Sequence, residues 1–344
     1  MTLRFLVENP LETPDWDNRL REFPDATPFH TTAWARVLTD SYGFQPVYLT
    51  AETPGGRAII PFMEVRSPLL GKKGVSLPFS DFCPPLLQGD IEPQPLLEEA
   101  LRIARQRRWK TVQFRGLSQT EWPASGRFWR HDIDLRRTPD TLQASLPSST
   151  RRNINKALRE GVTIQTTLST ESLNAYYDLH CRTRKRLGVP PQPASFFASI
   201  YTHVLNRGLG NILLAFQNKR LLAGAIFFHF GKFSLYKFGA SDYAFQDLRA
   251  NNLLIWNAIQ LYRQGEFDIL SLGRTDMEDT GLRRFKNTWS PIESVLAYHT
   301  YDLRQGKFET ERPHSGVSIS RQICQRLPVP VLRWAGTLLY KYTA

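Results

Sequence analysis

Cysteine is scarce in this chain, and its three copies lie far apart, at positions 83, 181 and 324. They form no CxxC pair and have no His-rich neighbourhood, so a structural zinc site is not expected. An odd and sparse count is typical of a reducing compartment, where disulfides are rare. No apolar run reaches the roughly 18 residues of a transmembrane helix. The N-terminus does not have the pattern of a secretory signal, and we therefore expect a cytoplasmic protein.

The usual catalytic motifs are missing as well. The sequence has no G-x-S-x-G elbow, P-loop, H-E-x-x-H helix or G-x-G-x-x-G loop. Its seven histidines are scattered, at positions 30, 131, 180, 203, 229, 299 and 314. No paired carboxylates at hydrolase-like spacing stand out. Covalent and metal catalysis are therefore not indicated, and we assign no metal ligands.

Length and composition fit an ordinary folded protein. The 344 residues allow two domains or one large one, and 41% are hydrophobic and 22% charged. The net charge of +12 predicts anionic partners. Nucleic acid, phosphate-bearing substrates and the inner face of a membrane all qualify, and charge alone does not choose among them.

The two halves of the chain repeat one pattern. In the first half, two apolar strands flank Gly55-Gly56, and a helix and a strand follow over residues 96–116. In the second half, two apolar strands flank Asn218-Lys219, and a helix and a strand follow over residues 253–274. The repetition predicts two copies of one α/β unit.

A turn-rich segment near residue 145 marks the expected domain boundary. We divide the chain into an N-terminal domain (1–145), a C-terminal domain (146–310) and a tail (311–344). The tail mixes apolar, aromatic and basic residues and is interrupted by Pro328 and Pro330. A basic amphipathic tail can lie on an anionic membrane, or it can pack back onto its domain. Both interpretations stay open.

The segment 234–289 is the most informative stretch. Apolar residues at i, i+3, i+4 and i+7 from Ile255 predict a long helix. Asn251 or Asn252 is expected to cap its start, and Gly265 its end.

An apolar strand at residues 267–272 should follow this helix, and then a loop that ends in Phe285-Lys286. Polar and basic residues crowd the junctions between these elements, where binding and catalysis concentrate. They are Lys237, Asp242, Arg249, Asn251, Asn252, Arg274, Asp276, Arg283, Arg284 and Lys286. Any one of them could be a solvated loop residue, but the whole set favours a functional site.

The order YKFGASD, LRANNLLIWNAI, FDILSLGRT and GLRRFKNTW resembles the FemABX-like, peptidoglycan-bridge branch of the GNAT acyltransferase superfamily. The resemblance covers most of the chain and is densest over residues 148–301. Its most specific element is the Phe-Lys pair in the G-L-R-x-F-K-x-x-W context. It implies an α/β (α+β) fold of tandem GNAT-like domains, each a mixed, mostly antiparallel sheet flanked by helices.

With covalent and metal catalysis not indicated, direct acyl transfer by positioning and oxyanion stabilisation remains. The resemblance implies that Lys286 stabilises the tetrahedral intermediate, that Phe285 shapes the pocket and that Tyr236 contacts substrate. Other predicted substrate-binding residues are Lys237, Asp242, Arg249, Asn251, Asn252, Arg274, Arg283, Arg151, Arg152 and Asp81. Asn251 and Asn252 head a helix whose N-terminus suits phosphate.

The resemblance also implies a substrate class. We expect transfer from aminoacyl-tRNA, acyl-CoA or acyl carrier protein to an amine of a cell-envelope or exopolysaccharide precursor, without a tightly bound cofactor. Two departures weigh against a peptidoglycan precursor and an aminoacyl-tRNA donor. The chain has no heptad stretch for a coiled-coil arm, and Ala35-Arg36 follows Trp34 where some members carry a lysine.

Two other classes stay open. An acyl-CoA-dependent N-acetyltransferase of a small molecule would usually have a glycine-rich pyrophosphate loop, which the residues at 249–252 lack. A non-enzymatic basic protein bound to membrane or nucleic acid would explain the charge, yet no RNP or helix-turn-helix signature occurs. Expected partners are an anionic or lipid-linked substrate, tRNA, and the inner membrane face through the tail, with no specific DNA.

Overall fold

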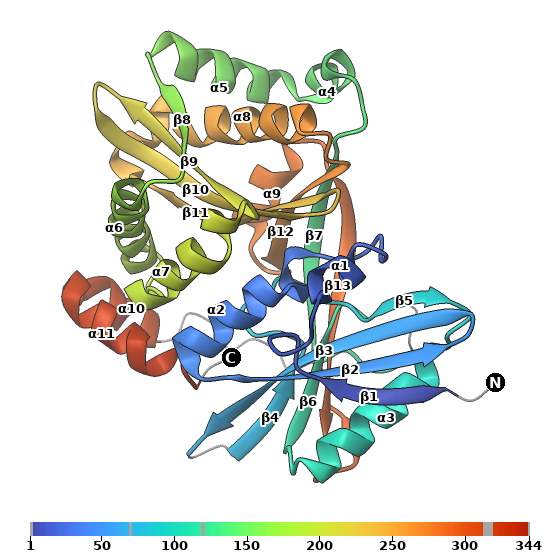
Figure 1. Ribbon diagram of the computed structural model, residues 1–344. Coiled ribbons are helices and arrows are strands. Elements are labelled where there is room, and N and C mark those ends of the chain that lie inside the picture. The colour runs from blue at the N-terminus through green and yellow to red at the C-terminus, as the bar shows by residue number, and fades with distance from the viewer. Residues whose placement is uncertain (1–2, 69–70, 118–120, 312–318, 343–344) are drawn as a thin grey trace. The chain divides into compact units, whose positions relative to one another are not determined.

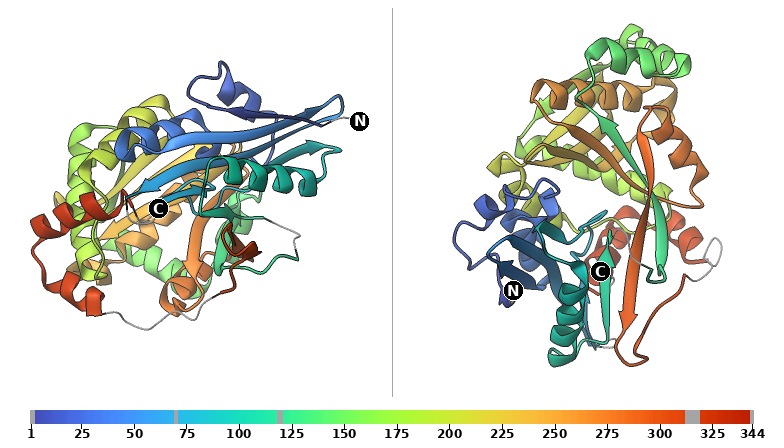
Figure 2. Two further views of the ribbon diagram at one scale, coloured as in Figure 1. Left: turned by 90° about the horizontal axis from the view of Figure 1, so that it is seen from below. Right: turned by 90° about the vertical axis from the view of Figure 1, so that its right-hand side faces the viewer.

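The computed structural model describes residues 3–68, 71–117, 121–311 and 319–342. The chain forms two compact units, which the ribbon views of Figure 1 and Figure 2 show from three sides. Unit 1 comprises residues 1–129, 295–314 and 340–344, and unit 2 comprises residues 130–294 and 315–339. Each unit therefore takes segments from both halves of the sequence. The boundaries placed at residues 145 and 310 stay a prediction.

Unit 1 is built on a mostly antiparallel sheet with the strand order β1-β2-β3-β4-β6-β13. These strands are β1 (Arg4–Glu8), β2 (Gln45–Thr53), β3 (Gly56–Ser67), β4 (Gly71–Val75), β6 (Thr111–Arg115) and β13 (Ile292–Asp302), with β5 (Leu86–Gly89) on β3 and β14 (Lys307–Phe308) on β13. The helices are α1 (Trp16–Leu20), the 3-10 turn η1 (Pro28–His30), α2 (Thr32–Tyr42) and α3 (Pro93–Gln106). Leu96, Ala100 and Ile103 of α3 share one buried cluster with Val47 and Phe62 of the sheet, and the helix expected at the start of residues 96–116 is confirmed.

Unit 2 repeats the plan with the strand order β7-β12-β11-β10-β9-β8. Its strands are β7 (Gly126–Asp134), β8 (Thr163–Thr167), β9 (Gly210–Gln217), β10 (Arg220–Phe230), β11 (Phe233–Ser241) and β12 (Ile269–Asp276). Its helices are α4 (Pro139–Ser145), α5 (Ser148–Arg159), α6 (Thr170–Arg186), α7 (Ala194–His203), the 3-10 turns η2 (Leu205–Arg207) and η3 (Tyr243–Leu248), α8 (Ala250–Gln264), α9 (Thr280–Asn287), α10 (Ile319–Arg326) and α11 (Val329–Leu339). Helices α5 and α8 cover one face of the sheet, and α6 and α7 cover the other (Figure 1).

The predicted duplication is visible in the strand pairing. In unit 1, β4 pairs in parallel with β6 after the crossover through α3, over residues 73–75 and 111–113. In unit 2, β11 pairs in parallel with β12 after the crossover through α8, over residues 233–235 and 269–271. The ladders that join β1 to β2, β2 to β3, β3 to β4 and β5, β6 to β13, β13 to β14, and β8 to β9, β10 and β11 in turn are antiparallel. Both units are therefore one α/β design, as the repeated helix–strand pattern predicted.

The tail forms two short helices, α10 and α11, which both contact α6. They are separated at Leu327 and Pro328, in the proline-bearing region where an interruption was expected. Residues 312–318, at the start of the tail, lie outside the described residues. Within the described part of the chain, no helix combines the length and hydropathy of a bilayer-spanning segment.

A buried histidine gives unit 1 a pH-dependent stability. Nδ1 of His30 accepts the Thr27 N–H at 3.0 Å, so the ring proton sits on Nε2 and is donated to the Pro84 carbonyl at 2.9 Å. Burial lowers the pKa of His30 from 6.5 to about 4. As the pH falls, this histidine therefore binds a second proton in the unfolded chain before it does so in the folded protein. The contribution of His30 to the free energy of unfolding is fully present above pH 6.5 and is lost as the pH falls towards 4.

We predict that His30 contributes about 3 kcal/mol to the loss of unfolding free energy between neutral pH and pH 4. Urea unfolding of the wild type and of His30→Gln, measured across this range, checks the prediction. The variant should show a shallower pH dependence, and an unchanged slope would refute the role assigned to His30.

Candidate functional site

The parallel pair β11–β12 opens towards its carboxyl ends. The ladder joins Phe233–Leu235 to Ile269–Ser271, although β11 continues to Ser241 and β12 to Asp276. Among the described residues, no further ladder pair joins the two strands beyond Leu235 and Ser271. Ligands of open α/β sheets bind at the carboxyl ends of parallel strands, so this opening is the place to look for a site.

A bulge in β11 contributes to the opening. The register of β11 on β10 changes from Ile226↔Phe238 to Phe227↔Tyr236, which leaves Lys237 as the extra residue. A bulge bends its strand and redirects neighbouring side chains. The bulge thus falls on YKFG, a segment picked out by the sequence.

Lys286 holds the opened end of β12. Its Nζ donates to the carbonyl oxygens of Gly273 at 3.2 Å and Arg274 at 2.8 Å, and the residue is only 4% exposed. A buried ammonium is costly unless it is hydrogen-bonded, and these two carbonyls lie just beyond the end of the parallel ladder. The interaction places a positive charge inside unit 2, at the carboxyl ends of the strands.

The Phe-Lys pair lies on a helix, which corrects the expectation of a loop. Helix α9 covers it and is capped by Asp279, whose carboxylate accepts the Leu282 N–H at 2.9 Å. Phe285, half-buried on the same helix, packs against the core of unit 2, with its ring 6.4 Å from that of Trp289. The helix thus buries Lys286 and partly buries Phe285, whereas Arg284 and Asn287 are exposed.

A polar network that the sequence did not reveal adjoins this lysine. Asn287, next to Lys286, bonds His131 Nδ1 through its Oδ1 at 3.1 Å and donates from Nδ2 to Glu293 at 2.9 Å. Arg283 clamps the same Glu293 with two hydrogen bonds of 2.7 and 3.0 Å. The Arg283 hydrogen bond lowers the pKa of Glu293 to about 2. Arg283, predicted to bind substrate, is therefore engaged with a carboxylate.

His131 itself is fully buried on β7, and its Nε2 has no hydrogen-bond partner among the described residues. Burial and then the charge of Lys286 lower its pKa, and Glu293 opposes this shift. His131 is therefore neutral near pH 7. No sequence signal could have linked it to Asn287, because the two lie 156 positions apart.

Tyr236 lies on the bulged strand β11, and its side chain contacts the neighbouring strand β10. Its ring packs edge-to-face on Phe227 at 5.4 Å, and its hydroxyl occupies the space that a Cβ at position 239 would fill. Burial raises the pKa of Tyr236 to about 12. The hydroxyl is therefore protonated at neutral pH, and Gly239 is required for its position.

The start of α8 differs from the prediction. The residue before the helix is Arg249, in the left-handed conformation (φ 59°, ψ 27°), and no side chain caps the helix. Asn251 and Asn252 lie inside the first turn, so their predicted capping role is wrong, whereas Gly265 ends the helix as expected. The first turn carries no acidic residue. An uncapped helix start with an exposed arginine suits an anionic group.

Three more of the predicted site residues lie at or near the opening between β11 and β12. Lys237 and Arg274 are half-buried at the opened ends of β11 and β12, beside the residues above. Asp242 caps η3 through the Ala244 N–H at 3.1 Å and lies 3.5 Å from the Arg182 guanidinium. These residues belong with the opening in unit 2.

The other three candidates are engaged elsewhere. Arg151 donates to the carbonyls of Gln143 and Ala144 at the end of α4, where a cation is favourable. Arg152 donates to its neighbour Ser148 on α5 at 3.3 Å. Asp81 lies in unit 1, where its backbone carbonyl accepts the Tyr298 hydroxyl.

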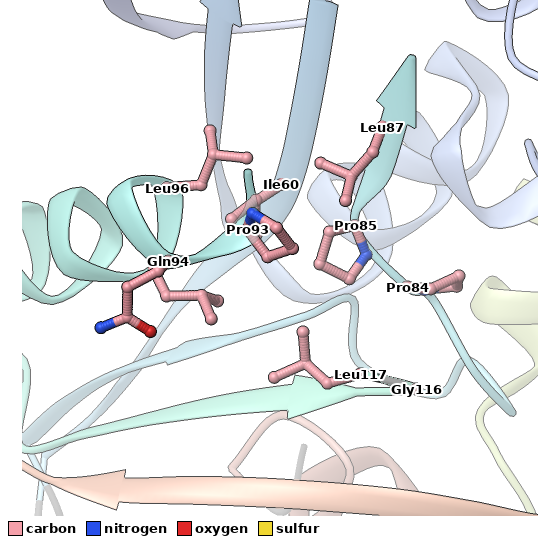
Figure 3. A pocket seen from close by; sticks show the side chains of 10 residues that line it. Ile60, Pro84, Pro85, Leu87, Pro93, Gln94, Leu96, Gly116 and Leu117 are labelled. Atoms are coloured by element: carbon pink, nitrogen blue, oxygen red, sulfur yellow. The ribbon is translucent and has the colours of Figure 1, made fainter. Parts of the chain in front are cut away.

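Unit 1 contains a separate, uncharged cavity of about 420 Å³. Figure 3 shows its lining from β3, from the loop before β5, from the start of α3 and from the end of β6. The lining residues are Ile60, Pro84, Pro85, Leu87, Pro93, Gln94, Leu96, Leu97, Gly116 and Leu117. None of these described residues is charged, so the cavity offers no ion-pair partner to a charged reacting group. No cluster of described His, Cys, Asp or Glu side chains could hold a metal ion.

Comparison with known proteins agrees with this geometry. Residues 145–287 match the acetyltransferase (GNAT) domain family. No curated protein matches the chain at the level of sequence. Among solved structures, FemX aligns with a TM-score of 0.66 at 16% identity, covering 88% of this chain and 98% of FemX.

Two further structures share the fold. L-PGS from Bacillus licheniformis aligns with a TM-score of 0.55 at 15% identity, over 87% of this chain and 94% of its own. A tandem GNAT protein from the clavulanic acid biosynthesis pathway aligns with a TM-score of 0.51 at 11% identity, over 88% and 98% of the two chains.

The protein is thus an acyltransferase with a GNAT domain in unit 2, which contains the opened strand pair and Lys286. Over 88% of its length the chain shares the fold of FemX, which agrees with the resemblance to the FemABX-like branch noted in the sequence. The predicted α/β fold class with GNAT-like units is confirmed.

The position of Tyr236 can be tested by coupling it to Gly239. We predict that Gly239→Ala destabilises the wild type by about 1–3 kcal/mol, because the new methyl group displaces a packed ring. In a Tyr236→Ala background the same substitution should cost much less. Urea unfolding of the four proteins in this double-mutant cycle measures the coupling. Additive effects would contradict the proposed contact.

Proposed function

We propose that this protein is an N-acyl or aminoacyl transferase, which moves an activated acyl group onto an amine of a cell-envelope or exopolysaccharide precursor. The observation that carries the proposal is the buried ammonium of Lys286 at the opened end of a parallel strand pair, within a GNAT domain. The amine nitrogen attacks the acyl carbonyl carbon and a C–N bond forms. The C–S or C–O bond to the donor breaks, and the proton lost by the amine goes to the leaving group.

Lys286 acts electrostatically in this proposal. The carbonyl oxygen of the acyl group becomes negative as the amine adds, and a fixed positive charge at this point lowers the energy of the intermediate. The carbonyls of Gly273 and Arg274 fix the ammonium before substrate binds, so little reorganisation is needed during the reaction. We infer that Tyr236, with its protonated hydroxyl, orients the acyl group.

The donor is proposed to approach along the opened strands towards α8. Acyl-CoA, acyl carrier protein and aminoacyl-tRNA all carry phosphate. In the first two donors a pantetheine arm separates the phosphate from the thioester, and in the third the phosphate and the acyl ester are on the same terminal nucleoside. The uncapped N-terminus of α8 and the exposed Arg249 would hold such phosphate. The donor is a substrate in this scheme, and no tightly bound cofactor is invoked.

The acceptor is proposed to be anionic or lipid-linked. The net charge of +12 favours an anionic partner. The uncharged cavity of unit 1 supports a substrate with an uncharged portion. Such an acceptor would be met in the cytoplasm, at the inner face of the membrane.

An acyl-CoA-dependent N-acetyltransferase of a small molecule is the second candidate, favoured by the match to an acetyltransferase domain. Product formation is followed by mass spectrometry with each donor, and with amine acceptors that carry or lack an alkyl chain. Transfer from acyl-CoA to small soluble amines alone would favour this second function.

Because the chain is an acyltransferase, the non-enzymatic alternative is set aside.

Arg249 allows the donor site to be tested separately from stability. A non-glycine residue in the left-handed region is strained by about 1–2 kcal/mol. We predict that Arg249→Gly leaves the unfolding free energy unchanged or raises it slightly, while donor affinity falls roughly tenfold, the scale of one charge-assisted hydrogen bond. Arg249→Lys, which keeps the charge, is the matched control. Undiminished donor affinity in the glycine variant would remove Arg249 from the site.

Lys286 is the decisive residue for catalysis. We predict that Lys286→Met lowers kcat by about 10²–10³-fold, with a small change in KM, because the lost charge acts on the transition state. Initial rates with the best donor of the mass-spectrometric screen measure this effect.

Arg284→Met is the matched control, since Arg284 is exposed on the same helix and should tolerate the change. Unfolding curves of each variant exclude a folding defect, and Lys286→Arg, which keeps the charge, should retain more activity than Lys286→Met. A folded Lys286→Met enzyme with wild-type kcat would disprove the mechanism.

A further inference from the structure

The outer side of the two C-terminal helices presents an apolar surface to solvent. Trp334 is 67% exposed and Ile323 52%, and Val331, Leu338 and Leu339 are each more than two-fifths exposed. Val331, Trp334 and Leu338 follow i, i+3, i+7 spacing, so they lie on one side of α11. We call these five residues the C-terminal apolar face.

The opposite side of α11 is fixed to unit 2. Leu332 is buried, and Gly336 lies so close to the Pro191 carbonyl that a side chain would overlap it. Arg333 stacks on Tyr177 at 5.0 Å and bonds Asp178 of α6. The structure therefore separates residues that the sequence grouped together, and it leaves the apolar face outside a rigidly packed helix.

The charges on α10 and α11 themselves have one sign, and the neighbouring carboxylate of Asp178 on α6 is paired with Arg333. Residues 319–342 contain no aspartate or glutamate. Arg321 and Arg326 on α10 are exposed, and so is Arg186 at the end of α6, whose backbone carbonyl accepts the Gln325 side chain at 3.0 Å. An exposed tryptophan and aliphatic residues with arginines beside them are the pattern of a segment that lies in a membrane interface.

We propose that the C-terminal apolar face binds the surface of an anionic lipid bilayer. Trp334, Val331 and Leu338 would enter the boundary between headgroups and acyl chains, while Arg321, Arg326 and Arg186 approach the anionic headgroups. Each arginine near such a surface contributes attraction that falls with salt. The inference does not depend on the proposed function, because binding is measured without donor or acceptor.

The same charges argue against other occupants. Two copies of the chain joined through this face in a symmetric pair would bring its arginines close to one another, and like charges at an interface are unfavourable. A polynucleotide would be attracted by the arginines but would not cover the aliphatic side chains. An anionic lipid surface matches both the apolar side chains of the face and the arginines beside it.

Vesicle flotation tests the proposal. The full chain is mixed with vesicles of phosphatidylcholine alone or of phosphatidylcholine with phosphatidylglycerol. Binding is expected to the anionic vesicles only. It should weaken by roughly tenfold or more in Arg321→Gln/Arg326→Gln, which removes two of the charges, and it should be lost in Trp334→Glu/Leu338→Glu.

Two further variants complete the design. Leu158→Glu alters an apolar residue of α5 that is 55% exposed away from the tail, and it should bind as the wild type does. Trp334→Phe should still bind, but the fluorescence quenching caused by brominated lipids should decrease. Wild-type binding by the Trp334→Glu/Leu338→Glu variant, or equal binding to neutral vesicles, would overturn the proposal. So would a wild-type dimer that this variant dissociates, since a second copy would then be the occupant.

Discussion

The hydrogen bonds from the Lys286 ammonium to the carbonyls of Gly273 and Arg274 are the interaction on which the site depends. Beyond Ser271, β12 no longer pairs with β11, and its backbone needs other partners. A side chain from α9 supplies a donor and a positive charge together. In the proposed mechanism one residue thus provides both the stability of the opened strand and the catalytic electrostatics, which would explain why a lysine is buried here.

Unit 1 solves the same structural problem with different chemistry. Its parallel ladder β4–β6 runs to the end of β4 at Val75, and a cation again meets the backbone just beyond, since Arg115 donates to the carbonyls of Leu77 and Ser80 at 3.1 and 3.3 Å. Unit 1 has an uncharged cavity beside the start of α3, whereas unit 2 has an arginine at the start of α8. The duplicated design has therefore diverged, and unit 2 alone carries the arrangement expected for acyl transfer.

The sequence predicted the long elements well and the site geometry only in part. The helices at α3 and α8 and the duplication were predictable, because apolar periodicity over 14 or 15 residues is a strong signal. Helix α9, with eight residues, is too short for such a signal and was expected to be a loop. The left-handed Arg249 could not be foreseen, because that conformation is rare for a side chain as large as arginine.

Other features depend on tertiary contacts. His131 meets Asn287 only through the placement of β7 in unit 2, and Tyr236 meets Gly239 only because a bulge shifts the register of β11. In the tail, periodicity could not tell Leu332, which is buried, from Leu338, which is exposed. Residue types were thus predictable from the sequence, but their partners were not.

The central claim is that an activated acyl donor binds where β11 and β12 separate, beside Lys286 and the start of α8. Hydrogen–deuterium exchange with acyl-CoA, and separately with aminoacyl-tRNA, tests it most directly. The account predicts slower exchange at residues 236–240, 250–253 and 273–276 with at least one donor, and no change in β8 and β9. Protection that excludes these three segments, or none with either donor, would contradict it.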